Sequence, residues 1–463
     1  MPLPMPHPPA DGRVMLLYSD RMADASPSLA APERPSGIAR ALRHRNFQLF
    51  FCGQLLSLTG TWMQSIAQSW LVYRITGSAI LLGTVGFSGQ IPVFFLAPIG
   101  GALADRHRRR RIIVITQSAA MILAFVLAAL TLTGRVRVWH IMTLSALMGV
   151  VNAFDIPARQ AFLVEMVGRE DLMNAIALNS SMFNGARLIG PAVAGILVAG
   201  IGEGWCFFAN GVSYLAVIAG LLMMRLGPWS PPERTASTLE NVLEGMSYVR
   251  RTAPIRALLL LVGLVSLVAM PYTVLMPVFA DTVLRSGPRG LGVLMGATGM
   301  GALLGALFVA SRRGLRGLGK VTAAAAAGFA VSLILFAISR RFWLSATMLV
   351  PVGFCMMLQM ACTNTLIQSM VPERLRGRVM AVYSMMFMGM APIGALLAGV
   401  AAGHIGAPLT VSIGALCGLA GAGIFARHLP SLRGEATRLI LAQGMIGGEP
   451  ADEMNTRGIT AEE

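Results

Sequence analysis

The chain contains few charged residues. Only 13% of its 463 residues are charged, whereas 55% are hydrophobic. Soluble domains carry roughly a quarter charged residues, and a soluble fold this apolar would expose large apolar patches to water. The composition therefore excludes an ordinary soluble protein and predicts one that is embedded in a lipid bilayer.

Acidic residues are scarcer than basic ones, with 21 Asp and Glu against 37 Lys and Arg, so the net charge is +16. Such an excess could indicate a nucleic-acid partner. The arginines, however, are spread over short gaps between apolar segments and form no long basic face. We therefore expect no nucleic acid to bind.

The sequence also lacks the patterns of a catalytic or metal site. Its five cysteines have no paired or CxxC spacing, and its six histidines lie in tails, loops or helix ends. The stretch GLRGLGKV at 314–321 resembles a phosphate-binding loop, but a valine follows its lysine and no strand precedes it. No paired carboxylates or Ser/His/Asp set lies at membrane depth. We expect no enzyme, no cofactor, no metal and no ATP bound by this chain.

The sequence does contain a series of apolar segments near 20 residues long, enough for a helix to cross about 30 Å of hydrocarbon. Twelve are predicted, at 47–73, 79–104, 112–132, 139–158, 173–200, 204–224, 255–281, 288–310, 321–339, 342–368, 378–402 and 405–427. The fold class is thus an all-α membrane protein with twelve transmembrane helices.

A long polar gap divides the helices six and six. We expect an N-terminal six-helix bundle at 37–224, a cytoplasmic linker at 225–254 and a C-terminal bundle at 255–428. The segments 1–36 and 429–463 are predicted to be cytoplasmic tails, and the first lacks the apolar core of a signal peptide.

The distribution of arginine predicts the orientation. With the N-terminus inside, most Lys and Arg fall in the inner segments. The outer segments carry only Arg74, Arg135, Arg137, Arg285, Arg289, Arg340 and Arg341. Both termini are therefore expected in the cytoplasm, in a multi-pass protein of the cell inner membrane.

The two halves repeat at an offset of 204 residues. Gly101-Ala102-Leu103 falls on Gly305-Ala306-Leu307, and Ala194-Gly195 falls on Ala398-Gly399. Parallel six-helix repeats are a transporter architecture, with the substrate site between the halves. Three charges are not repeated: the offset places Asp105 on Val309, Asp155 on Gln359 and Arg187 on Ala391.

The stretch GGALADRHRRRR at 100–111 resembles a loop signature of the major facilitator superfamily, Gly-x-x-x-Asp-Arg-x-x-Arg, matched by Gly101, Asp105, Arg106 and Arg109. The stretches around 154–195 and 370–399 resemble the branch of that superfamily containing the enterobactin exporter and macrolide efflux proteins. The resemblance covers roughly residues 38 to 428 and implies two pseudo-symmetric six-helix bundles that alternate access to a central site.

The resemblance implies a conformational latch at the inner end of helix two. In this fold Asp105 would lie near the start of helix eleven, whose free N–H groups would stabilise it by about 0.3–1 kcal/mol. Arg109, Asp155 and Arg159 could complete a charge cluster that latches the halves together and favours the outward-facing state. The alternative is a solvated loop charge.

Helix five contains Gly185, Gly190, Pro191 and Gly195, which resemble the Gly-Pro motif of the superfamily's antiporters. Glycines there would allow close packing and a bend, and the motif favours export over uptake. The alternative is packing of small residues such as Gly292-x-x-x-Gly296.

Arg187 is predicted near the bilayer centre, where an arginine costs roughly 2.5–3.5 kcal/mol on insertion scales. It shares a helical face with Ser180 and Asn184, and no carboxylate is expected at its depth. Its partner is therefore either a set of carbonyls and amides or an anionic substrate.

Uncharged polar residues at helical spacing predict the rest of a substrate cavity. Helix one carries Gln54, Thr61, Gln64 and Gln68, and helix ten carries Gln359 and Asn364 among methionines, which suit an adaptable binding surface. The alternative is hydrogen bonding between helices.

Together these features predict a secondary transporter that exports an amphipathic small molecule, such as a siderophore or a macrolide-like drug, in exchange for protons. An importer of the same fold is the nearest alternative. A membrane enzyme or a non-transporting membrane scaffold is an alternative of a different class.

Overall fold

The computed structural model describes residues 40–168, 170–227, 238–312, 314–315, 317–443, 445–446 and 449–450. The chain divides into Met1–Arg40 and Ala41–Glu463, and the contacts below lie in the second unit. The predicted tail at 1–36 and the Pro-rich part of the predicted linker lie outside the described residues.

The N-terminal half consists of one short and six long helices. After the 3-10 helix η1 (Arg40–Arg43) come α2 (Arg45–Thr76), α3 (Ala79–Arg106), α4 (Arg109–Leu132), α5 (Val138–Val167), α6 (Leu172–Ile201) and α7 (Glu203–Met223). Glycine ends three of these helices: Gly77, Gly168 and Gly202 have positive φ angles of 60°, 73° and 90°, which few other residues adopt.

The C-terminal half begins after a short connecting helix, α8 (Thr238–Arg251). Its first spanning segment is broken into α9 (Ala253–Val268), α10 (Tyr272–Val278) and the π-helix η2 (Phe279–Val283). The remaining elements are α11 (Gly287–Ser311), α12 (Leu318–Ile338), α13 (Phe342–Met370), α14 (Glu373–Ile405), α15 (Ala407–Ala442), β1 (Met445–Ile446) and β2 (Glu449–Pro450).

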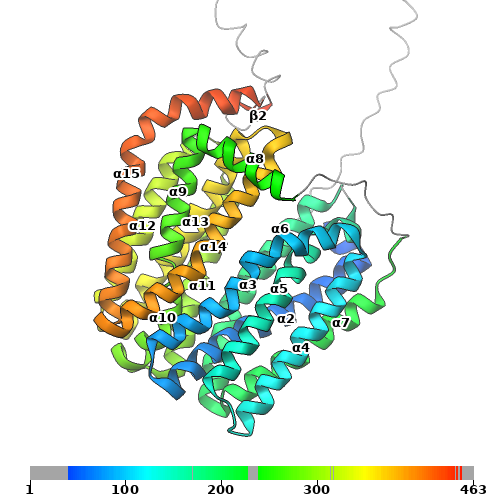
Figure 1. Ribbon diagram of the computed structural model, residues 1–463, viewed down its shortest axis with the longest axis vertical. Helices are drawn as coiled ribbons and strands as arrows, with labels where there is room; N and C mark the ends of the chain where they lie inside the picture. Colours follow the sequence, from blue (N-terminus) through cyan, green and yellow to red (C-terminus); the bar gives the residue numbers. More distant parts are fainter. Residues whose placement is uncertain are drawn as a thin grey trace, which may run out of the picture. The chain divides into compact units, whose positions relative to one another are not determined.

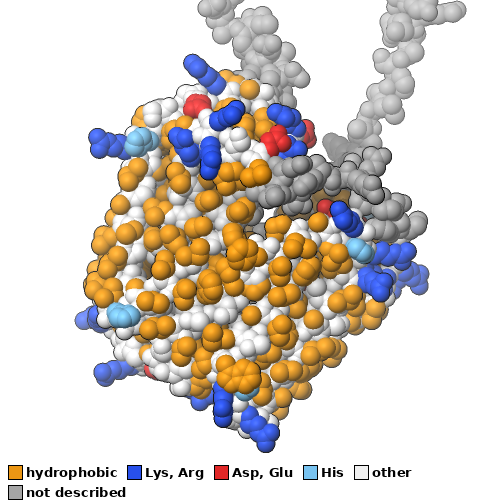
Figure 2. All heavy atoms as spheres, in the orientation of Figure 1, with side chains coloured by type: hydrophobic (Ala, Val, Ile, Leu, Met, Phe, Trp, Pro, Cys, Tyr) orange, Lys and Arg blue, Asp and Glu red, His pale blue; other side chains and the backbone are white. Residues whose placement is uncertain are grey.

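Eleven helical segments of the described chain are long and apolar enough to cross a membrane, with α9, α10 and η2 counted as one. The remaining long helix, α2, has 32 residues but a row of polar side chains, so it is less apolar than the others. Figure 2 shows one face, on which hydrophobic side chains cover the middle and arginines gather towards the two ends. This distribution fits a protein surrounded by lipid, and the segments correspond to the twelve expected from the sequence.

The principal contacts within the two halves match one for one. In the N-terminal half α2 packs on α6 and α7, α5 packs on α3 and α4, and α4 packs on α7. In the C-terminal half α9 packs on α14 and α15, α13 packs on α11 and α12, and α12 packs on α15 (Figure 1). The predicted pair of pseudo-symmetric six-helix bundles is confirmed.

The halves meet at two related helix crossings, α6 on α11 and α3 on α14. A Cβ atom added to Gly292 would lie 2.8 Å from the Cα atom of Gly195, and one added to Gly399 would lie 2.8 Å from that of Gly83. No side chain fits in such a space, so the backbones approach because all four positions are glycine. We call this end of the helices, where α3 and α11 begin, the Gly83 end, and the opposite end the Asp105 end.

Two helices are longer than expected. α5 continues to Val167 through Pro157, because a proline kinks a membrane helix without ending it. α15 continues past the predicted boundary at 428 to Ala442, because Leu432, Ala436 and Leu439 recur at helical spacing and pack against the apolar core.

Candidate transport and coupling sites

The acidic residue of the loop signature lies at the surface of the Asp105 end. The Asp105 side chain is 58% exposed, and its carboxylate lies 3.7 Å from Arg109. Arg109 pairs more closely with Glu165 at the end of α5, at 2.9 Å. In the described residues Asp105 forms no hydrogen bond or ion pair with the start of α14, so the expected contact is not made in this state. Gly101 and Arg106 are near it on α3, and a Cβ added to Gly101 would touch nothing within 4 Å.

Asp155 lies in a separate and buried cluster. Its carboxylate accepts hydrogen bonds from Thr116 (2.8 Å) and Gln117 (2.9 Å) of α4, and it lies 3.3 Å from Arg159. The residue is 2% exposed and sits about 18 Å from the end of α5 at 1.5 Å per residue. Asp155 was expected at a helix end beside Asp105, but because α5 is longer it lies inside the bundle.

The residues of the helix-five motif take different roles along α6. Gly190 packs against α2, where an added Cβ would lie 2.5 Å from the Cβ atom of Trp62. Gly195 and the carbonyl of Pro191 face Gly292 across the boundary between the halves. Gly185 has open space around its Cα atom. The motif therefore allows close approach at two of its glycines.

Arg187 reaches from α6 towards the C-terminal half. Its guanidinium carbon lies 5.6 Å from the ring centroid of Trp62 on α2, and Nη2 lies 3.8 Å from Sδ of Met356 on α13. Tyr272 of α10 lies within electrostatic range of Arg187, and its buried hydroxyl lies near the Thr298 side chain. No carboxylate pairs with Arg187 in the described part of the chain. A desolvated cation–π contact is worth about 2 kcal/mol, less than the cost of placing the charge in a membrane.

The polar row on α2 faces neighbouring helices of its own half. Gln64 accepts a hydrogen bond from Asn210 of α7 at 2.7 Å, and Gln68 donates one to Ser145 of α5 at 2.8 Å. Thr61 donates to the carbonyl of Ser57 and lies 3.5 Å from the hydroxyl of Tyr214. These contacts favour the alternative interpretation, hydrogen bonding between helices.

The remaining predicted cavity residues are mostly buried. Gln54 is 1% exposed, and its Oε1 atom has no hydrogen-bond partner in the described residues. Asn184 donates to the carbonyl of Ser180 on its own helix. Gln359 is 3% exposed, and Asn364 accepts a hydrogen bond from Gln368 at 3.0 Å. Of the predicted set, Arg187 is thus the charged group that spans the boundary between the halves.

Several polar partners were not anticipated from the sequence. Glu203 at the start of α7 is buried and accepts two hydrogen bonds from Arg74 at the end of α2, at 2.7 and 3.2 Å. Glu165 and Asn210 complete the contacts of Arg109 and Gln64. The amide of Asn210 inside an apolar segment was an available signal, because such a group needs a partner in the membrane, whereas both acids lie outside the predicted segments.

No group of His, Cys, Asp and Glu suited to a metal ion exists among the residues that the structure describes. Two histidines bond locally: His404, at the end of α14, and His428, inside α15, each contact a carbonyl one turn earlier.

Three known transport proteins are similar in sequence to most of this chain. It is 25% identical to the staphyloferrin A transporter of Staphylococcus aureus, over 79% of this chain and 91% of that protein. It is 29% identical to the multidrug efflux pump Tap of Mycolicibacterium fortuitum, over 83% and 96%. It is 25% identical to the enterobactin exporter EntS of Shigella boydii, over 77% and 85%.

The fold is also that of solved transporters. The crystal structure of the nucleoside transporter NupG superposes with a TM-score of 0.65 at 13% identity, covering 84% of this chain and 99% of that one. The model of one family, described as transmembrane secretion effector, matches residues 36–449. The chain therefore belongs to the transmembrane secretion effector family of the major facilitator superfamily.

Proposed function

We propose that this protein exports an anionic, amphipathic small molecule, of the siderophore or drug-like class, across the inner membrane. The relatives named as a multidrug efflux pump and an enterobactin exporter support export as the direction, and the staphyloferrin A transporter supports a siderophore-like cargo. The observation that carries the choice of an anion is Arg187, a membrane-buried cation between the two halves with no carboxylate among its described contacts.

The surroundings of Arg187 favour an aromatic or phenolic acid over a simple inorganic anion. Trp62 presents a ring face and Met356 a polarisable thioether, both of which suit an aromatic ring. The buried Tyr272 hydroxyl can donate a hydrogen bond to a bound oxygen atom. An anion placed there would stabilise Arg187 in a site where water screens little charge.

Transport by Arg187→Gln and Arg187→Lys variants in proteoliposomes tests this proposal. The glutamine variant should export a catecholate or carboxylate compound at least tenfold more slowly, which corresponds to a free-energy difference of about 1.4 kcal/mol. The lysine variant should retain more transport activity because it keeps the positive charge. Export of a neutral drug should change little. Equal loss for neutral and anionic compounds, in protein that still folds by size-exclusion chromatography, would contradict an anionic cargo.

We further propose proton antiport, with Asp155 as the proton-binding group. The buried Asp155 carboxylate accepts hydrogen bonds from Thr116 and Gln117 of α4 and lies beside Arg159 of its own helix, so a proton bound there would change contacts between two helices. Protonation would weaken the pair with Arg159 and free that arginine to move, so the charge state and the helix arrangement would be linked.

An Asp155→Asn variant separates coupling from transport. It should lose export driven by an imposed pH gradient but keep exchange of substrate for substrate at equal pH. Glu165→Gln is the matched control, since it removes an acid from the same helix at its end. Normal gradient-driven export by Asp155→Asn would exclude Asp155 as the coupling residue.

The orientation completes the proposal. Both termini would lie in the cytoplasm, so the Asp105 end would face the cytoplasm and the Gly83 end the outside. The helices are then held together by glycine crossings at the outer end, and the exposure of Asp105 suits a state whose inner latch is not formed.

A further inference from the structure

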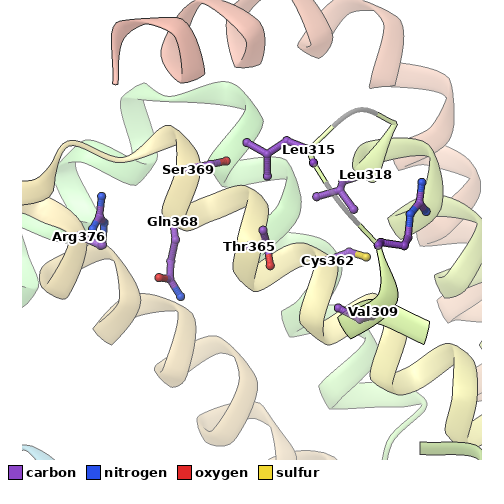
Figure 3. A pocket seen from close by; sticks show the side chains of 10 residues that line it. Val309, Leu315, Leu318, Cys362, Thr365, Gln368, Ser369 and Arg376 are labelled. Atoms are coloured by element: carbon purple, nitrogen blue, oxygen red, sulfur yellow. The ribbon is translucent and has the colours of Figure 1, made fainter. Parts of the chain in front are cut away.

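A cavity of about 510 Å³ lies in the C-terminal half at the Asp105 end, away from Arg187 and its contacts. It is enclosed by the end of α11, the start of α12, the end of α13 and the start of α14 (Figure 3). Its lining residues are Val309, Arg312, Gly314, Leu315, Leu318, Cys362, Thr365, Gln368, Ser369 and Arg376.

Among the described residues that line it, the cavity has two positive charges and no counter-ion. None of the described residues that line it is acidic, and neither Arg312 nor Arg376 forms an ion pair in the described chain. Arg374 and Arg378, on either side of Arg376, both pair with Glu244 of α8. The Nε atom of Arg376 is buried without a hydrogen-bond partner, which costs about 1–3 kcal/mol unless something accepts the bond.

The same corner of the N-terminal half is neutralised from within. There Glu165, at the end of α5, lies 2.9 Å from Arg109. The repeat relates α5 to α13: Gly149 and Gly353 are 204 residues apart, and a Cβ atom added to either would meet a backbone carbonyl oxygen of the neighbouring helix, that of Gly89 or Thr298. This offset places Ser369 at the position of Glu165.

Ser369 cannot replace the missing carboxylate. It lines the cavity, but its hydroxyl donates to the carbonyl of Leu366 on its own helix. The offset places Arg312 at the position of Arg108 and Arg376 at that of Leu172, so this corner has gained an arginine and lost the acid. An anion from outside the chain would restore the balance.

We propose that this cavity binds a phosphate group. Guanidinium groups from Arg312 and Arg376 match phosphate oxygens in charge and geometry, and the Thr365 hydroxyl and Gln368 amide lie on the same wall for further hydrogen bonds. Figure 3 shows Gln368 on α13 and Arg376 on α14, both lining the cavity. The volume exceeds that of a bare phosphate, so the group is part of a larger molecule. Anionic lipid headgroups and soluble phosphate compounds both carry this chemistry.

The binding of two probes to the purified full-length protein tests the proposal. Short-chain phosphatidylglycerol and inorganic pyrophosphate are titrated separately, with adducts counted by native mass spectrometry and short-chain phosphatidylcholine as the lipid comparison. We expect at least one phosphate probe to bind, with tenfold or greater weakening in Arg312→Gln/Arg376→Gln. Binding of phosphatidylglycerol alone identifies a lipid site, and binding of pyrophosphate identifies a site for soluble phosphates.

Two further variants keep the test decisive. Arg427→Gln/Arg438→Gln removes two exposed charges of α15 that do not line the cavity, and it should bind as the unaltered protein does. Ser369→Glu restores the carboxylate of the N-terminal half and should abolish binding with both arginines present. If Arg312→Gln/Arg376→Gln or Ser369→Glu misfolds, the single variant Arg312→Gln takes its place. It changes an exposed residue, and it should still weaken binding of the phosphate probe. No binding to the unaltered protein, or equal binding by these cavity variants, would overturn the proposal.

Discussion

Replacing Gly83 by alanine should push the two halves apart at the Gly83 end. The added Cβ would lie 2.5 Å from the carbonyl oxygen of Ala395 and 3.0 Å from the Cα atom of Gly399, so backbone must move. Overpacking of this kind costs about 1–3 kcal/mol. Only the state that contains the α3–α14 crossing bears that cost, so its population should fall about 5- to 150-fold relative to states that lack it.

The distance between spin labels across the Gly83 end measures this shift. Arg135, in the α4–α5 turn, and Arg340, in the α12–α13 turn, are exposed and lie at that end in opposite halves. Labels at Arg135→Cys and Arg340→Cys, with the exposed Cys52 and Cys417 changed to serine, should report longer distances in Gly83→Ala.

Gly423→Ala is the matched control for this experiment. Gly423 lies inside α15 and has no atom within 4 Å of an added Cβ, so it shares the helix-propensity effect without the clash. Identical distance distributions in Gly83→Ala and Gly423→Ala would refute the idea that the glycine crossing holds this end closed.

Three further outcomes can be measured directly. Asp105→Asn should abolish most transport in vesicles while leaving expression and substrate binding intact, since the carboxylate is expected to act in another conformational state; normal transport would exclude the latch. Reporter fusions at residues 240 and 440 should indicate the cytoplasm and those at 136 and 286 the outside, and a cytoplasmic signal at 286 would break the six-plus-six arrangement. Glu203→Gln should lower the free energy of unfolding by about 1 kcal/mol, because it weakens the ion pair with the half-exposed Arg74. Arg135→Gln, at the same end of the helices, should leave the free energy of unfolding unchanged.

The helices were predictable because each spanning segment is a continuous apolar run with charges near its ends. The repeat at an offset of 204 predicted the two bundles, and the matched helix contacts bear this out. Helix ends were less predictable: the predicted segment ended at 158, yet α5 continues to Val167, because in a membrane the alternative to a helix is an unsatisfied backbone. The end of α15 depends on packing against the core, which composition alone does not give.

The partners of the polar residues depend on which helices are neighbours. Spacing placed Gln64 and Gln68 on one face of α2, but it could not tell that Asn210 and Ser145 lie opposite them. The same is true of Asp155, whose donors come from α4. Arg187 could be identified from the sequence alone, because a charged residue inside an apolar segment is rare.

The separation of Asp155 from Arg187 predicts that coupling and cargo recognition are independent. Asp155 contacts Thr116, Gln117 and Arg159, whereas Arg187 contacts Trp62 and Met356, so the two groups share no partner among their described contacts. Effects of residues without shared partners usually add within about 0.3–0.5 kcal/mol. Export by Asp155→Asn, Arg187→Gln and the double variant should therefore show losses that multiply, with the pH dependence following the first change and the preference for anions the second. A double variant no slower than either single variant would mean that the proton and the anion use one linked site, and the assignment of separate roles would have to be given up.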